Sequence, residues 1–288
     1  MTDPIVIVGG ASLDTIIHLD TLPTGEPQTL WPRESYKAVG STGAGKALNL
    51  AALGYPVILH TLLGRDAAGE HIRRHLNRSN IALLVDETDA PTEQHTNLMA
   101  ADGGRISLFT QPPAAPENPD WRPVEDAMAR ACCVVINILA YTLPALAIAK
   151  QHAIPLWTDL HDYDGKTPYH QPFIDAADVL FLSSDRLPDY RSFMASQIAN
   201  GKTLVVCTHG DRGATLLSHT GEWIEQPALK VAPVVDTNGA GDAFFSGFLA
   251  AYLKGAPLAR CMLSAAASGA ACVMSRDLVG ADPRTLMP

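Results

Sequence analysis

The stretch Asp236–Leu253, DTNGAGDAFFSGFLAAYL, decides the fold because it joins a turn of small residues to an apolar helix. Gly239, Ala240 and Gly241 have little side-chain bulk, so their backbone N–H groups can face one concavity. Apolar residues then recur at helical spacing, and the N-terminus and dipole of the predicted helix favour an anion. Asp242 stands at the mouth of this predicted anion site.

A carboxylate beside an anion site repels the phosphate that the amides attract, unless it has a task there. Accepting a proton from an attacking hydroxyl is such a task, because phosphoryl transfer needs positioning, charge neutralisation and a base. In the structural interpretation, Asp242 only caps the helix and the glycines only form a turn. The spacing alone leaves both interpretations open.

Apolar, β-branched runs recur along the chain, and most are continuous rather than alternating. Continuous runs are typical of strands covered on both faces by helices. The runs are Ile5–Val8, Val57–Leu59, Cys133–Ile136, Asp178–Leu182 and Thr203–Cys207. Helices are expected between them at 45–53, 68–79, 124–131, 143–151 and 188–199. The alternation predicts an α/β fold, a three-layer α/β/α sandwich with a mostly parallel central sheet.

Two segments, 29–39 and 95–109, break this pattern because polar and apolar residues alternate in them, with a turn at 102–104. Alternation is typical of antiparallel strands with one face in solvent. We expect a single domain over residues 1–288 with a small β lid from about 28–39 and 95–110, which shields the phosphoryl group from water. The edges of the lid offer a surface for a homodimer.

The composition excludes several classes of protein. With 288 residues, 47% of them hydrophobic and 18% charged, the chain can bury a core and is not disordered. The balance of 21 basic against 30 acidic residues has the wrong sign for a nucleic-acid partner. The five cysteines show no C-x-x-C spacing and are expected to be reduced, buried thiols of a cytoplasmic protein.

The segment Ala131–Ala149 is the one candidate for a membrane span, because it contains no charged side chain. Asn137, Thr142 and Pro144 divide it, and proline is tolerated in the first turn of a helix. We therefore expect a strand, a turn and a helix there. No membrane partner and no export signal are expected.

The motif DTNGAGDAFFSGF resembles the C-terminal signature of the ribokinase-like family of carbohydrate and nucleoside kinases, the phosphofructokinase-B type. The resemblance extends in the same order through the segments Gly9–Glu26, Gly40–Gly54, Gly64–Ile72 and Val205–Leu217. It implies ATP-dependent phosphorylation of a hydroxyl, expected to be primary, on a sugar or nucleoside. The substrate within that range stays open.

The resemblance also implies roles for individual residues. Asp242 corresponds to the catalytic base, and the amides of Gly239, Ala240 and Gly241 correspond to the anion hole. The implied substrate-binding residues are Asp14, Gly40, Ser41, Gly45 and Lys46. The implied nucleotide-binding residues are Ser183, Arg186, Thr208, Gly210, Thr237 and Ser264. The alternative is a purely structural role: Asp14 as a turn or cap residue, and Thr208 and Gly210 as an ordinary turn at the end of a strand.

The same resemblance implies ATP as co-substrate with Mg²⁺, and a monovalent cation such as K⁺ near the loop of Asp236. Magnesium bridges phosphate oxygens and keeps most of its water, so a protein cage is not expected. Asp185 is the candidate that reaches this ion through water.

Three positions depart from the family pattern. Ser183–Arg186 replaces Asn-x-x-Glu. This leaves three alternatives: Asp185 serves the metal, Arg186 contacts phosphate directly, or the loop has lost its role. Ser41 replaces the second glycine of a pair, and Gly45 replaces an asparagine that touches the sugar; Lys46 or Asn49 could supply the donor instead. Ser264 replaces an asparagine near the adenine.

Two further functions compete with the kinase. The altered Ser183–Arg186 loop motivates a non-catalytic sugar or nucleotide sensor of the same fold. Gly40–Lys46 matches G-x-x-x-x-G-K, which motivates a P-loop hydrolase, but Ala47 stands where the magnesium-binding hydroxyl is required. Asp159, His161 and Asp162 form a polar cluster that could bind metal or phosphate, although such clusters are more often solvated loops.

Overall fold

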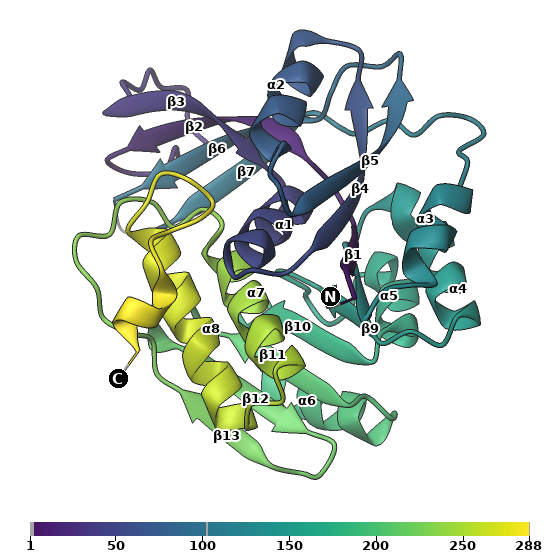
Figure 1. Cartoon of the computed structure of the whole chain (residues 1–288). Helices are drawn as coiled ribbons and strands as arrows, with labels where there is room; N and C mark the ends of the chain where they lie inside the picture. The colour runs from purple at the N-terminus through teal and green to yellow at the C-terminus, as the bar shows by residue number, and fades with distance from the viewer. Residues whose placement is uncertain (1–2, 102, 288) are drawn as a thin grey trace.

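The computed structural model describes residues 3–101 and 103–287, and its centre is a nine-stranded sheet (Figure 1). The strand order is β13-β12-β11-β10-β9-β8-β1-β4-β5. The bounds are β1 Ile5–Val8, β4 Val57–Gly64, β5 Ile81–Thr88, β8 Cys133–Ile136, β9 Leu156–Asp159, β10 Val179–Ser183, β11 Leu204–Thr208, β12 Ala214–Ser218 and β13 Trp223–Gln226. The seven strands β11, β10, β9, β8, β1, β4 and β5 pair in parallel, and β12 and β13 continue the sheet antiparallel.

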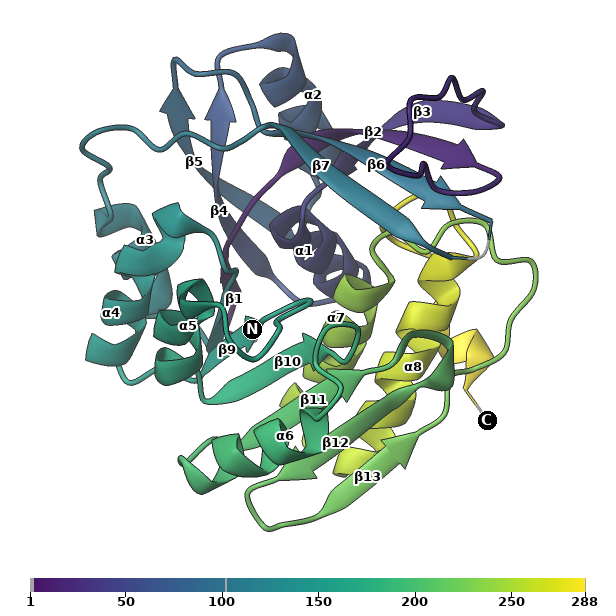
Figure 2. The same ribbon diagram turned by 180° about the vertical axis from the view of Figure 1, so that it is seen from behind.

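Helices cover both faces of this sheet, as Figures 1 and 2 show from opposite sides. One face carries α1 Thr42–Ala52, α2 Ala67–Leu76, α7 Ala240–Leu253 and α8 Leu258–Val273. The other carries α3 Arg122–Met128, α4 Leu143–Gln151, α5 Gln171–Ala176 and α6 Tyr190–Ala199. The central strands are buried on both faces because successive side chains enter one core or the other: Ile5 and Ile7 join one, Val6 and Val8 the second. The three-layer α/β/α prediction is confirmed.

The lid is a four-stranded sheet in the order β3-β2-β6-β7. Its strands are β2 Ser12–Leu19, β3 Glu34–Gly40, β6 Gln94–Ala100 and β7 Arg105–Gln111. The pairs β2–β3 and β6–β7 are antiparallel hairpins, but β2 and β6 pair in parallel. The sequence did not predict β2 as part of the lid.

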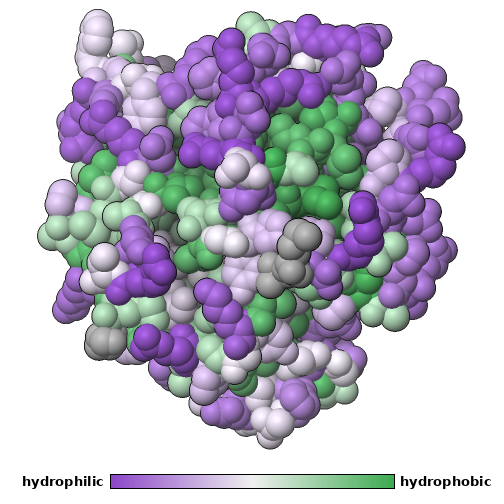
Figure 3. Space-filling view, viewed as in Figure 1, coloured by the Kyte–Doolittle hydropathy of each residue, from purple (hydrophilic) through white to green (hydrophobic). Residues whose placement is uncertain are grey.

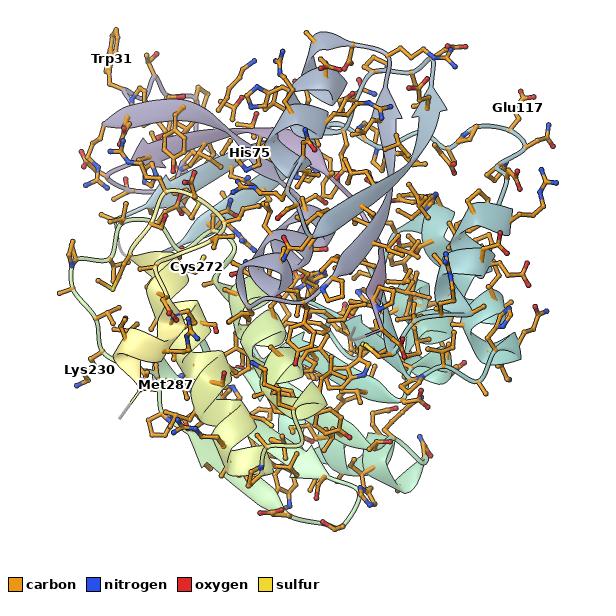
Figure 4. All side chains as sticks on the ribbon, in the orientation of Figure 1. Trp31, His75, Glu117, Lys230, Cys272 and Met287 are labelled. Atoms are coloured by element: carbon orange, nitrogen blue, oxygen red, sulfur yellow. The ribbon has the colours of Figure 1, made fainter. Side chains whose placement is uncertain are left out.

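Other predicted boundaries differ from the structure. Residues 29–33 form no strand, because Pro32 cannot donate to a ladder, and Trp31 projects from this loop away from the body (Figure 4). The predicted turn at 102–104 includes residue 102, which lies outside the described residues. The segment VAPVV at 231–235, which reads as a strand before the glycine turn because it is apolar and rich in valine, is a loop containing Pro233.

The segment Ala131–Ala149 contains β8, a 3-10 turn and α4, so the predicted strand, turn and helix are confirmed. Among the described residues, no helix is long and apolar enough to cross a membrane.

All five cysteines are free, and all except the half-buried Cys132 are buried. The face in Figure 3 is mostly hydrophilic, with apolar residues gathered over β4 and β5.

Candidate active site

The glycine turn begins α7 as the sequence predicts. Gly239 is the N-cap residue with φ +78°, a left-handed conformation that favours glycine, and a Cβ there would lie 2.8 Å from Leu278 Cδ2. Within the described chain, the amides of Gly239 and Gly241 donate to no other group, and the Ala240 amide reaches Thr237 O at 3.4 Å. The first turn of α7 therefore presents free N–H donors.

Aromatic packing fixes the position of this helix. Phe245 and Phe248 of α7 are fully buried. Their ring centroids lie 4.6 and 5.4 Å from that of Phe181 on β10, and both rings lie 6.1 Å from Trp157 on β9. Burying each phenylalanine contributes about 1.5–3 kcal/mol, so the N-terminus of α7 is held firmly against the sheet.

Asp242 lies in the first turn of α7 and contacts a buried lysine. Lys46 Nζ on α1 is 2.5 Å from Asp242 Oδ1 and 3.1 Å from Asp159 Oδ2 at the end of β9. Burial raises the pKa of the Asp242 carboxyl, and the Lys46 charge opposes this rise only in part. The site thus combines free amides with a carboxylate whose pKa is shifted toward that of a general base.

Asp159 is a site residue whose role the sequence left unassigned. Its Oδ1 accepts the backbone N–H of His161 at 3.0 Å. Burial raises the pKa of Asp159, but the nearby His161, Lys46 and backbone N–H outweigh burial and lower it to about 2. The available signal was its place directly after a buried strand, where neighbouring parallel strands end at one edge.

Asp14 on β2 lies at the junction of the lid and the main sheet and is 2% exposed. Ser12 Oγ donates to its Oδ1 at 2.5 Å, and Asn97 Nδ2 on β6 donates to its Oδ2 at 3.0 Å. A Cβ on Gly40 would lie 2.1 Å from Asp14 Oδ2, so only glycine fits there. Asp14 and Gly40, both predicted from the sequence, are brought together.

Glu93 and His95 extend this polar pocket and were missed, because only the lid pairing brings them to Asp14. His95 Nδ1 is 3.4 Å from Asp14 Oδ1, and His95 Nε2 is 2.8 Å from Glu93 Oε1 but out of line for a hydrogen bond. Burial lowers the pKa of His95, but its contacts with Asp14 and Glu93 raise it to about 9. Glu93 Oε1 is buried without a well-aligned donor among the described residues.

Ser41 precedes α1 with φ +67° and ψ +153°, a region that is essentially restricted to glycine. A Cβ built on Gly10 would lie 2.3 Å from Ser41 Oγ and 3.1 Å from Glu93 Oε2, so both oxygens border the same point. The Ser41 hydroxyl thus faces the pocket of Asp14 and Glu93. Asn49 instead donates to Gly45 O and Leu278 O, both at 2.8 Å, so its side chain holds helix α1 to the C-terminal segment.

The nucleotide candidates lie at the carboxyl ends of β10 and β11. Ser183 and Thr208 are register partners, and Thr208 Oγ1 donates to Leu182 O at 3.3 Å. Gly210 follows, exposed, with φ +60°. Ser264 is half-buried on α8, and Thr237 lies in the glycine turn. The register of the sheet therefore brings two of these candidates side by side.

The side chain of Arg186 is 59% exposed and lies 3.5 Å from Asp162 and 3.7 Å from Asp164. Asp185 is exposed and forms no ion pair within the described chain. Asp236 is buried, and its oxygens accept Tyr36 O–H at 2.7 Å and Asn238 N–H at 2.8 Å. Asp236 therefore anchors the glycine turn to the lid through Tyr36.

The P-loop alternative is wrong. Gly40–Lys46 follows β3, a lid strand, whereas a P-loop follows a buried parallel strand. The Lys46 ammonium is fully buried and pairs with the carboxylates of Asp242 and Asp159. A phosphate that took their place would leave both carboxylates buried without a counterion.

The site thus combines an amide-lined helix N-terminus and a nearby carboxylate with a buried polar pocket at the lid sheet. Sequence comparison assigns the chain that carries it to the carbohydrate kinases. A sequence model described as pfkB family carbohydrate kinase matches residues 5–283. The chain therefore belongs to the pfkB family of carbohydrate kinases, which confirms the ribokinase-like resemblance.

Individual relatives with kinase names match this chain over most of its length. The acarbose 7(IV)-phosphotransferase of Actinoplanes sp. is 32% identical, in a match covering 98% of this chain and 96% of that protein. The ribokinase of Arabidopsis thaliana is 26% identical, covering 97% and 78%. The solved structure of the microbiome-derived acarbose kinase Mak1 is 29% identical and matches with a TM-score of 0.84 over 99% and 98% of the two chains. The chain is thus a sugar or nucleoside kinase, a phosphotransferase with an alcohol acceptor.

Proposed function

We propose that the chain transfers the γ-phosphoryl group of ATP to a primary hydroxyl of a carbohydrate, with Asp242 as base. The observation that carries this proposal is the Asp242 carboxylate in the first turn of α7, beside the free amides of Gly239 and Gly241. The amides are placed to bind the oxygens of the migrating phosphoryl group, and the dipole of α7 adds to this attraction. These roles follow the family signature residue by residue.

In the proposed step, the acceptor hydroxyl gives its proton to a carboxylate oxygen of Asp242 as its own oxygen bonds to the γ-phosphorus. The bond between that phosphorus and the oxygen bridging to the β-phosphate breaks, and ADP leaves with the bonding electrons. The products are the phosphate ester, ADP and one proton, which Asp242 later releases to water. The lid keeps water from taking the place of the hydroxyl.

The acceptor pocket supports a carbohydrate over a nucleoside. Asp14, Glu93 and Asn97 are each at most 3% exposed, and carboxylate oxygens accept hydrogen bonds from adjacent hydroxyls. Two acarbose kinases are among the relatives with the highest identity. We therefore propose that the acceptor is an oligosaccharide or pseudo-oligosaccharide with a hydroxymethyl group.

The residues present also fit a magnesium ion carried by ATP. No three acidic, histidine or cysteine side chains cluster into a cage in the described chain, and hydrated magnesium needs only one or two carboxylates. We propose that Asp185 meets this ion through water; the ion would neutralise charge on the phosphates. Both oxygens of Asp236 already accept one donor each, so a role near K⁺ is tested by comparing turnover in potassium and sodium salts.

The deciding experiment is a kinase screen with ATP and Mg²⁺ over acarbose, maltose, glucose, fructose, ribose and adenosine, with mass detection of the phosphorylated product. Asp242→Asn is expected to lower kcat about 10²- to 10⁴-fold while nucleotide binding stays largely intact. Asp282→Asn removes an exposed carboxylate outside the site and serves as the matched control. An Asp242→Asn enzyme with near wild-type kcat would refute the assignment, and ligand binding without turnover across the panel would favour the sensor.

A homodimer through the lid is a further proposal. Leu108 and Phe109 on the lid edge strand β7 are 48% and 57% exposed, and an edge strand with exposed apolar groups can pair with a second copy. Light scattering on Leu108→Lys against wild type tests it: loss of a dimer supports the pairing, and a monomeric wild type refutes it.

A further inference from the structure

Lys46 is a fully buried cation in direct contact with the proposed base. Its ammonium lies 2.5 Å from Asp242 Oδ1, 3.1 Å from Asp159 Oδ2 and 4.9 Å from the centre of the Phe245 ring. A buried ammonium is costly unless it is paired, and here two carboxylates pair with it. Burial lowers the pKa of Lys46, but the charges of Asp242 and Asp159 outweigh burial and raise it, so the side chain stays charged.

Gly45 bounds the same carboxylate on its other side. A Cβ at position 45 would lie 2.6 Å from Asp242 Oδ2, so any side chain there would displace the carboxylate. The Asp242 carboxylate is thus held between the Lys46 ammonium at Oδ1 and the bare backbone of α1 at Oδ2. Its position is set by α1 as much as by α7.

The two carboxylates give this cluster a charge balance that suits a base. With Lys46, Asp242 and Asp159 ionised, these three groups carry one net negative charge. The His161 imidazole also faces them, with its Nδ1 3.6 Å from Asp159 Oδ2. When Asp242 accepts a proton it becomes neutral, and Lys46 keeps Asp159 as its counterion. Proton transfer therefore leaves no unpaired charge in a buried place, whereas a Lys46–Asp242 pair alone would leave an unpaired ammonium.

We propose that Lys46 is a positioning residue, which holds the Asp242 carboxylate ionised and fixed against α1 for attack by the acceptor, with Asp159 as its permanent counterion. This inference rests on the proposed role of Asp242 as base. It assigns Lys46 to the base and not to the sugar.

The test is Lys46→Met, which keeps the length of the side chain and removes its charge. A misplaced base can cost about 10²-fold in rate, so kcat is expected to fall about 10- to 100-fold while the KM for ATP stays within about twofold. Removing a contacting opposite charge raises a carboxyl pKa by about one to three units. The acidic limb of the kcat/KM profile is therefore expected to move to higher pH by that amount.

Lys202→Met is the matched control, because Lys202 is also buried and its ammonium donates to Ala177 O at 2.6 Å and Asp175 O at 3.1 Å, away from Asp242. It is expected to lower the melting temperature but to leave kcat and the acidic limb unchanged. A shift of the acidic limb in both variants would show that loss of any buried lysine produces it, which would overturn the proposal.

Gly45→Ala separates position from charge. The new methyl group displaces the Asp242 carboxylate while Lys46 stays charged, so kcat is expected to fall with little movement of the acidic limb. Should Lys46→Met fail to fold, Lys46→Gln, which removes the charge but keeps a polar side chain, is measured in its place. An unshifted acidic limb in the variant that folds overturns the proposal.

Parallel assays of Asp242→Asn distinguish the two levels of failure. An inactive Asp242→Asn with a Lys46→Met enzyme that matches wild type in kcat and pH profile removes the positioning role and leaves the base in place. An active Asp242→Asn removes the base, and the role of Lys46 fails with it. Loss of activity in Asp242→Asn together with the shifted profile of Lys46→Met supports both.

Discussion

The proposed acceptor side and the proposed nucleotide side of the site differ in how firmly their side chains are held before substrates bind. On the acceptor side, Asp14, Glu93 and Asn97 are at most 3% exposed and hydrogen bonds or close contacts fix them in place. On the nucleotide side, the side chains of Arg186 and Asp162 are 59% and 63% exposed and their contact is loose at 3.5 Å. The proposed acceptor pocket is therefore preorganised, whereas the proposed nucleotide side is exposed and loosely held before any ligand binds.

Asp14→Asn is expected to have the largest effect, and to affect the acceptor side alone. Asp14→Asn keeps the shape but removes charge-assisted hydrogen bonds worth about 1.5–3 kcal/mol. We expect kcat/KM for the acceptor to fall about 10- to 100-fold, with the KM for ATP unchanged, measured by steady-state kinetics. An equal change in both KM values would show that the two sides are not separable.

Arg186→Ala probes the nucleotide side. Exposed charged contacts contribute about 0.2–1 kcal/mol, so we expect the KM for ATP to rise up to about fivefold and the acceptor KM to stay the same. Steady-state kinetics with varied ATP checks this. No change in the KM for ATP discards a phosphate contact for Arg186.

His95 makes the acceptor side sensitive to pH. Its pKa of about 9 is above the unfolded value of about 6.5, so the stabilisation is complete below about pH 6.5 and is lost as the pH rises through 9. We expect the melting temperature of wild type to fall between pH 7 and 10 by about 2 °C or more beyond the fall in His95→Gln. Parallel melting curves of the two proteins would contradict this.

Ser41→Gly gives the smallest expected effect. Backbone strain of this kind costs about 1–3 kcal/mol, and the greater freedom of glycine in the unfolded chain offsets about 0.5–1 kcal/mol of the relief. We expect a net gain of about 1 kcal/mol in the free energy of unfolding, measured by urea titration. A loss of stability would show that the Ser41 hydroxyl makes a compensating contact.

Much of the fold was predictable from local pattern. Ile5–Val8 and Cys133–Ile136 match the structure at both ends, because continuous apolar runs between turn residues have few alternatives. Strand β2 was not predicted as part of the lid because its parallel pairing with β6 joins segments that are far apart along the chain. Alternation shows that one face is polar, but it does not show which sheet a strand joins.

The site was predictable where a motif carries the chemistry. The glycine turn and Asp242 fall at the start of α7 as expected. Glu93 and His95 carry no local signature, since only the pairing of the lid strands brings them to Asp14. Asp159 stands out only as part of a polar cluster at a strand end, and its contact with Lys46 on α1 needs the fold. The contact of Lys46 with Asp242 has no local signal either, because the two residues lie 196 positions apart along the chain.

The order of the elements along the chain has a consequence for biosynthesis. All nine strands of the central sheet end by Gln226, whereas Asp242 follows on α7. A ribosome therefore delivers the strands and the proposed acceptor pocket first, and the proposed base among the last segments. A polypeptide that ends before α7 lacks the proposed base and also lacks the two helices whose apolar residues complete the core on one face of the sheet.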